Sequence, residues 1–378
     1  MKNYYLALPG PTPVAPEVLQ QMSVPMFNHR GQQFAQVFSK LTENCRVLFQ
    51  TNNPIYILTA SGTGAMEAAV VNTLSPGDDV LSLQNGAFGQ RFGDIARCYG
   101  ANVTTLEGEW GQGLPLEQVQ AALKAKTYKA ILVIHCETST GVLNKVQEVA
   151  KLRDQFSPET LILVDGISSL GATQLPVDQW NLDVVITGSQ KVLAAPPGLA
   201  MISMSKKALI AMETAKMPRY YWDLRKYQEF MTKGQTPFTP AISQIVAMKE
   251  ASQRFVDEGI EKAIQRHNKL MRMTRAGVQA LGLGLVCSDQ DAAPTVTSIY
   301  SPQGIKVAEL REHLRVNQGL ITAEGQGKYV GTVFRIGHLG ITDEGAILSY
   351  LGLLEQGLKE LELSKMPLGS AVAAALAI

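Results

Sequence analysis

The sequence has few cysteines, and the four that it has lie far apart. Cys45, Cys98, Cys136 and Cys287 form no CxxC pair, and none of the five histidines stands in HxxxH or HExxH spacing. These patterns argue against a zinc or iron–sulfur site, and they suit a reducing compartment. We therefore expect a cytoplasmic protein without a metal centre.

The sequence also lacks long apolar runs and any large excess of charge. No apolar run approaches the roughly 20 residues that cross a membrane, and residues 1–5 lack the charged and apolar regions of a signal peptide. The net charge of +1 gives no reason to expect nucleic acid or an acidic membrane as a partner. At 378 residues the chain is long enough for two domains. These features describe an ordinary soluble protein.

Short apolar runs alternate with helical segments through the first two thirds of the chain. Strands are predicted at 55–58, 80–83, 103–106, 130–135, 161–164, 184–187 and 198–204. Helices are predicted at 33–49, 65–74, 116–126, 144–156 and 206–215. This alternation predicts an α/β fold with a mostly parallel sheet and right-handed crossovers.

The last third predicts a smaller α+β unit. A long helical region, 241–281, is interrupted at Gly259, where we place a domain boundary. The predicted division is an N-terminal arm (1–17), a large domain (18–258) and a small domain (259–378). Within the small domain we expect strands at 296–300 and 332–337, a helix at 307–316 and a final helix capped by Thr342. The apolar residues 371–378 are expected to pack on a neighbouring surface or to be mobile.

Polar, aromatic or charged residues follow five of the predicted strands at the point where each strand ends. They are Ser61, Gly62 and Thr63, then Phe88, Thr138, Asp165 and Lys191. In an open α/β sheet, ligands bind beyond the carboxyl ends of the strands. We therefore expect these residues to converge at one edge of the sheet.

Asp165 and Lys191 have one specific chemical use. Pyridoxal 5'-phosphate requires a lysine for its Schiff base and an acid beside its ring nitrogen. The acid keeps the ring protonated, and the protonated ring withdraws electrons from the substrate α-carbon. On spacing alone, an ordinary ion pair at a sheet edge is the better explanation, and only the rest of the chain favours the cofactor.

Two further features fit a phosphorylated aromatic ligand, and each has a simpler explanation. Ser61, Gly62 and Thr63 precede an apolar helix whose free N–H groups and dipole suit a phosphate. The same residues also suit a plain helix cap. Phe88 could stack on a flat ring or belong to the core.

Arg335 lies in an otherwise apolar strand, 332–337. Arginine is rarely buried unpaired, and its planar guanidinium matches a carboxylate through two hydrogen bonds. A carboxylate substrate or a structural glutamate would satisfy it.

Taken together, several motifs resemble the alanine–glyoxylate and serine–pyruvate (serine–glyoxylate) aminotransferases, which are class V enzymes of PLP fold type I. The resemblance covers almost the whole chain. It rests on 8–13 (LPGPTP), 61–64 (SGTG), 85–91 (NGAFGQR), 137–143 (ETSTGVL), 164–166 (VDG), 188–191 (GSQK) with 195–198 (APPG), and 334–337 (FRIG). The GSQK, APPG and RIG motifs are the most specific of these.

The resemblance implies a cofactor, a homodimer with shared active sites and a role for each residue of the site. Lys191 forms the Schiff base and moves the proton, and Asp165 pairs with the ring nitrogen. Arg335 holds the substrate carboxylate, with Gly10 as a second substrate contact. The remaining cofactor contacts are Ser61, Gly62, Thr63, Phe88, Thr138 and Gln190, with Thr236 and Thr239 reaching the phosphate of the other subunit.

Three positions depart from common family patterns. Phe88 replaces tryptophan, Thr63 replaces histidine in some relatives, and Thr138 replaces serine. None removes an essential group, so the donor is less certain than the chemistry.

Two alternatives to a glyoxylate aminotransferase remain. One is another class V enzyme, such as an aminotransferase with a different donor, a lyase or a cysteine desulfurase. Desulfurases carry histidine directly before the lysine, where this chain has Gln190. The other is a non-catalytic accessory subunit, of the type labelled soluble hydrogenase small subunit.

Overall fold

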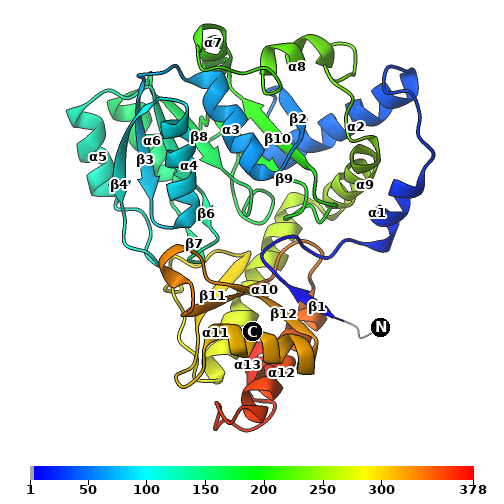
Figure 1. Ribbon diagram of the computed structural model, residues 1–378, viewed down its shortest axis with the longest axis vertical. Coiled ribbons are helices and arrows are strands. Elements are labelled where there is room, and N and C mark those ends of the chain that lie inside the picture. The colour runs from blue at the N-terminus through cyan, green and yellow to red at the C-terminus, as the bar shows by residue number, and fades with distance from the viewer. Residues whose placement is uncertain (1–3) are drawn as a thin grey trace.

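The computed structural model describes residues 4–378 as two main sheets joined by a bent pair of long helices (Figure 1). A third sheet has only two short strands, Cys136–Glu137 and Val142–Leu143. The first three residues of the predicted arm lie outside the described residues. No helix in residues 4–378 has both the length and the apolar character needed to cross a membrane.

The larger sheet has seven strands, and its order confirms the mostly parallel α/β prediction. In spatial order the strands are β2 (Ile55–Thr59), β10 (Leu199–Met204), β9 (Val184–Gly188), β8 (Leu161–Asp165), β5 (Ala130–Ile134), β3 (Asp79–Gln84) and β4 (Asn102–Glu107). The strand β10 is antiparallel to both of its neighbours, and the other pairings are parallel. The central strands are buried along their whole length, as strands covered on both faces must be.

Helices cover both faces of this sheet. One core joins the sheet to α2 (Gln32–Phe49), α5 (Leu116–Ala125), α6 (Val146–Phe156) and α9 (Ile242–Glu258). The other core joins it to α3 (Gly62–Thr73), α4 (Ala87–Cys98), α7 (Lys206–Thr214) and α8 (Leu224–Met231). The three-layer arrangement leaves the carboxyl edge of the parallel strands facing the smaller sheet (Figure 1).

The smaller sheet has four strands and incorporates the start of the chain. Its order is β1 (Tyr5–Ala7), β12 (Leu320–Glu324), β13 (Val333–Gly337) and β11 (Val296–Tyr300). Its helices are α10 (Ile260–Ala280), α11 (Val307–His313), α12 (Glu344–Glu360) and α13 (Ser370–Leu376), and a π-helical turn, Leu314–Gln318, follows α11. The short elements are α1 (Pro16–Gln20), β6 (Cys136–Glu137), β7 (Val142–Leu143) and 3-10 turns at Gln21–Ser23 and Gly327–Tyr329.

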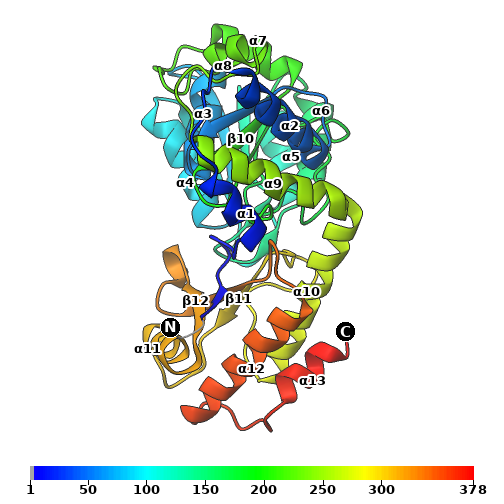
Figure 2. The same cartoon turned by 90° about the vertical axis from the view of Figure 1, so that its right-hand side faces the viewer.

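The predicted break in the long helix is confirmed. Gly259 has φ +83° and separates α9 from α10, and the two helices run in different directions (Figure 2). The domain limits themselves stay a prediction. The final segment forms α13, in which Ala371 and Ala375 are buried.

One predicted helix cap is wrong. We expected Thr342 to cap the helix that follows it, but Asp343 is the N-cap of α12 and accepts a hydrogen bond from the Ala346 N–H at 2.8 Å. The Thr342 hydroxyl instead donates backwards to the Leu339 carbonyl. This helix is also not the last, because α13 follows it.

Candidate active site

Side chains from the ends of β2, β3, β5, β8 and β9 line one cavity of about 150 Å³. The sequence-predicted residues that line it are Ser61, Gly62, Thr63, Phe88, Thr138, Asp165, Gln190 and Lys191. The expected convergence is therefore present in the structure.

Lys191 lies in the wall of this cavity, close to the N-terminal segment. Its Nζ donates a hydrogen bond to the Pro9 carbonyl at 2.6 Å. Gly10, with φ +130°, passes so near that a Cβ there would lie 2.7 Å from Lys191 Nζ, so any other residue would strain the backbone and displace the lysine. Burial lowers the pKa of Lys191 to about 8, which leaves more neutral amine near neutral pH than an ordinary lysine has.

Asp165 is the last residue of β8 and is almost fully buried. One carboxylate oxygen accepts a hydrogen bond from the Ile167 N–H at 2.8 Å. Burial raises the pKa of Asp165 to about 7, while Lys191 and Arg91 act in the opposite direction. Among residues 4–378, Asp165 forms no ion pair, so the simple Asp165–Lys191 pair that the sequence allowed is not found.

The loop after β2 brings the N-terminus of α3 to the cavity. The side chain of Ser61 caps the helix weakly, accepting from the Gly64 N–H at 3.4 Å. The first N–H groups of a helix have no intrahelical partner and attract anions. Across the cavity wall, the Gln190 side-chain oxygen is buried without a hydrogen-bond partner. The loop therefore caps the helix and also lines the cavity, and its role in binding a phosphate stays a prediction.

Phe88, in the first turn of α4, and Arg91, in the second, both line the cavity. The ring of Phe88 is partly buried, and the Arg91 guanidinium lies over it, 4.7 Å from the ring centroid. Arg91 also donates to the Thr63 hydroxyl at 3.4 Å. Phe88 is therefore not simply a core residue, because its ring forms part of the cavity wall.

Arg335 approaches the site from β13 of the smaller sheet. Its Nη1 donates to the Thr138 carbonyl at 3.1 Å and its Nε to the Glu324 carbonyl at 2.9 Å. Burial lowers the pKa of Arg335 to about 10. Within residues 4–378 it forms no ion pair and Nη2 has no partner, so the structural glutamate considered for it is not found.

Four predicted site residues do not line this cavity: Gly10 and Arg335, described above, and Thr236 and Thr239. Thr236 is buried and donates to the Phe238 carbonyl at 2.7 Å, and Thr239 is exposed. Neither lines the cavity of its own chain. Their predicted role concerns a second subunit and stays a prediction.

The sequence argument missed several residues of the cavity wall. Arg91 was visible only as the last residue of the NGAFGQR motif, and the helix that presents it was not predicted. Ser168 accepts a hydrogen bond from the Thr138 hydroxyl at 2.9 Å, and Cys136 also lines the cavity. These residues have no distinctive spacing, so their positions become evident only in the folded chain.

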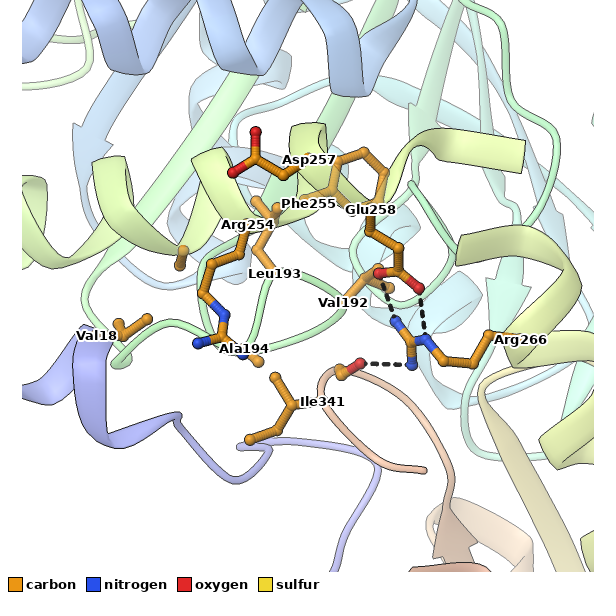
Figure 3. Close-up of a pocket in the computed structure, with 12 residues that line it drawn as sticks. Val18, Val192, Leu193, Ala194, Arg254, Phe255, Asp257, Glu258, Arg266 and Ile341 are labelled. Carbon is orange, nitrogen blue, oxygen red and sulfur yellow. Dashed lines mark hydrogen bonds and ion pairs between the residues drawn. The ribbon is translucent and has the colours of Figure 1, made fainter. Parts of the chain in front are cut away.

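A larger cavity, of about 390 Å³, lies on the far side of the loop that follows Lys191 (Figure 3). Its charged side chains already have partners. Arg266 forms two contacts with Glu258, at 2.6 and 3.0 Å, and donates to the Gly340 carbonyl, while Arg254 pairs with Glu17 at 3.0 Å. Charged side chains that are already paired with one another have few hydrogen-bonding positions left for a ligand. The larger volume therefore does not by itself make this cavity the functional site.

Comparison with known proteins gives consistent results over the whole chain. Residues 4–335 match the family described as Aminotransferase class-V. A Synechococcus protein named "Soluble hydrogenase, small subunit" is 41% identical over 98% of this chain and 97% of its own. The serine–glyoxylate aminotransferase of Methylorubrum extorquens is 35% identical over 98% and 94%. The crystal structure of an alanine–glyoxylate aminotransferase from Nostoc sp. superposes with a TM-score of 0.91, at 30% identity over 95% and 96% of the two chains.

Proposed function

The chain belongs to the class V aminotransferases of PLP fold type I, and from this premise we propose that it transfers the amino group of alanine or serine to glyoxylate. The observation that carries this proposal is the placement of Lys191, Asp165 and the α3 N-terminus around one cavity, with Arg335 beside it. The relatives acting on glyoxylate supply the choice of substrates.

The family is PLP-dependent, and the cavity of this chain fits that cofactor. The phosphate would lie at the N-terminus of α3 near Ser61 and Thr63, where free N–H groups favour an anion. Asp165 has one hydrogen bond from the protein and can accept another from the ring nitrogen. Phe88 provides an aromatic face for the ring. The phosphate, the ring nitrogen and the ring face of the cofactor would thus each have a partner in the cavity.

Arg335 and Lys191 are the groups that we assign to the substrate. The cofactor, when bound, supplies an aldehyde carbon that carries the amino group and a ring that stabilises negative charge at the substrate α-carbon. Arg335 has an unpartnered Nη2 with which to hold the α-carboxylate. Lys191 Nζ has a pKa of about 8 and is mostly neutral above that pH. It removes the α-proton and later returns a proton. Because the amino group waits on the enzyme between two substrates, the kinetics should be ping-pong.

We also propose that the protein acts as a homodimer whose subunits complete each other's sites. Thr239 is exposed, Thr236 lies three residues before it in the sequence, and neither lines the cavity of its own chain. Beside them, Tyr220 is 73% exposed and Tyr221 stacks on Phe238 at 5.1 Å between ring centroids. Exposed aromatic clusters of this kind commonly mark protein interfaces.

The proposed reaction can be tested by measuring glycine formation. The purified protein, supplied with PLP and glyoxylate, should form glycine with alanine or serine as donor, together with the matching keto acid. Aspartate serves as a third donor in the same assay. Glycine formation with aspartate alone would leave the aminotransferase class intact and overturn the donor. No glycine with any donor would favour an accessory role.

Arg91 gives a prediction about the cofactor phosphate. Because its guanidinium contacts Thr63 in the proposed phosphate site, Arg91→Gln should weaken PLP binding about tenfold, the loss expected for one charge-assisted hydrogen bond. Pyridoxal, which lacks the phosphate, should bind the variant as it binds the wild type. The control is Arg97→Gln on the same helix, where Arg97 pairs with Asp94. An equal loss for both ligands would mean that Arg91 acts through the Phe88 ring instead.

A further inference from the structure

Glu137 is a fully buried carboxylate that none of the proposed steps uses. It is the last residue of β6 and directly precedes Thr138. Burial raises the pKa of Glu137, and hydrogen bonds from its neighbours oppose that rise. A buried acid without an ion-pair partner needs several donors to offset its lost hydration.

Those donors come from the first turn of α4 and from Ser139. One oxygen of Glu137 accepts from the N–H groups of Phe88, at 3.1 Å, and Gly89, at 3.0 Å. The other accepts from the N–H of Ser139, at 3.1 Å, and from its hydroxyl, at 2.5 Å. The Ser139 hydroxyl in turn accepts from the Ala87 N–H at 3.0 Å. The first three N–H groups of α4, which have no partner within the helix, are therefore all held by Glu137 and Ser139.

The contact between Glu137 and α4 is close as well as polar. A Cβ at Gly86, the N-cap residue, would lie 2.3 Å from Glu137 Cδ. The helix start is thus pressed onto the carboxylate with no room for a side chain. Phe88 is the second residue of this helix, so the position of its ring depends on where Glu137 holds the helix.

The same segment reaches the substrate side of the cavity. The carbonyl of Thr138, next to Glu137, accepts a hydrogen bond from Arg335, and the Thr138 hydroxyl binds Ser168. A shift of Glu137 would therefore disturb a cofactor contact and a substrate contact together.

We propose that Glu137 is a positioning residue, which fixes the Phe88 ring and the Thr138 carbonyl so that the cavity is shaped for cofactor and substrate before either binds. This inference rests on the proposed function, since it concerns the same cofactor and substrate. Glu137 touches neither of them and acts through its neighbours.

The test compares Glu137→Gln with a matched variant, Glu355→Gln. Glu355 is also buried, and it accepts the N–H groups of Gly369 and Ser370 at 2.9 Å at the start of α13. That helix lies at the end of the small-sheet unit remote from the larger sheet (Figure 2). In each variant, whichever way the amide is turned, its NH₂ group meets backbone N–H donors. Both variants should therefore lose thermal stability.

The two variants should differ in cofactor binding. We expect Glu137→Gln to raise the Kd of PLP for the apo protein about tenfold and to reduce the visible circular dichroism of bound PLP, which reports how the ring is held. Glu355→Gln should leave both within twofold of wild type. Combining Glu137→Gln with Phe88→Leu should raise the Kd by less than the product of the two single effects, because both changes act on the same contact.

Each outcome decides the question. Equal PLP affinity in Glu137→Gln and Glu355→Gln, or effects of Glu137→Gln and Phe88→Leu that simply multiply, would overturn the positioning role and leave the proposed function standing. A wild-type protein that binds no PLP would overturn both. If Glu137→Gln does not fold, Ser139→Ala replaces it, because it removes the Ala87 contact and one donor to Glu137. It should weaken PLP binding about threefold, and wild-type affinity in that variant would contradict the proposal.

Discussion

Replacing Lys191 with alanine should reduce steady-state amino transfer by at least about a thousandfold. Lys191 Nζ lines the cavity, has a pKa of about 8 because of burial, and is the base that we assign to the substrate α-carbon. A positioned acid–base group contributes roughly 100- to 10,000-fold, and loss of the covalent link to the cofactor adds to this. The measurement is the glycine-forming rate with alanine and glyoxylate at saturating PLP.

Two controls distinguish the loss of a catalytic amine from a loss of folding: rescue by a small amine and replacement of a second lysine. Methylamine added to Lys191→Ala should restore part of the rate, because it supplies the missing neutral amine. Lys207→Ala is the matched control, since Lys207 also donates to backbone carbonyls, Pro158 at 2.9 Å and Thr160 at 3.1 Å, but lies outside the cavity wall. Unchanged turnover in Lys191→Ala would remove the assignment.

Replacing Arg335 with glutamine should raise the KM for the amino acid and for glyoxylate about 100-fold or more. Such losses, about 2.7 kcal/mol, are typical when one partner of a buried, hydrogen-bonded charge pair is removed. The Kd of PLP should change less than threefold, because Arg335 does not line the cavity and contacts Thr138 only at its backbone carbonyl, while the Thr138 hydroxyl stays bonded to Ser168. Steady-state kinetics on both substrates, with PLP titration of the apo protein, measure the two effects.

A buried arginine with a purely structural partner provides the comparison. Arg275 is buried and contacts Asp289 at 2.6 Å and the Cys287 carbonyl at 2.9 Å. Arg275→Gln should lower stability and leave both KM values near wild type. If Arg335→Gln instead weakened PLP and substrates by similar factors, Arg335 would be a structural residue and the carboxylate would need another site.

The large sheet could be predicted because each of its strands is recognisable from a short stretch of sequence. Ala130–Ile134 and Leu161–Asp165 are short apolar runs between helical segments, and each ends in polar or small residues. Since parallel strands share one carboxyl edge, the positions of Asp165, Lys191 and Ser61 followed from the order of elements.

The helix α4 escaped prediction for a physical reason. It contains Gly89 and Gly93, and glycine lowers helix propensity by about 1 kcal/mol per residue. Tertiary packing requires both glycines, because a Cβ at Gly89 would lie 3.0 Å from the Gln84 Cα and one at Gly93 would lie 2.6 Å from the Gln84 amide nitrogen. The helix exists because it packs closely on β3, which local sequence does not reveal. Because α4 was not predicted, the contacts that bring Phe88, Arg91 and Glu137 together could not be predicted either.

Two strands, β1 and β12, and the helix α8 were not predicted because each depends on contacts with distant parts of the chain. The three residues Tyr5–Ala7 form a strand only because they pair with Leu320–Glu324, far along the chain. None of the helices predicted from the sequence includes Leu224–Met231, which buries Leu224 and Tyr227 against the large sheet unit. Such elements depend on partners that no local pattern identifies.

The central claim, that Lys191, Asp165 and the α3 N-terminus form a PLP site for amino transfer, is tested most directly by the visible spectrum. The purified protein reconstituted with PLP should show the absorption band of the lysine-bound cofactor. Alanine or serine should bleach the band with release of one equivalent of keto acid, and glyoxylate should then restore it with release of one equivalent of glycine. A protein that shows no band after addition of PLP, or a band that no amino acid alters, would contradict the account.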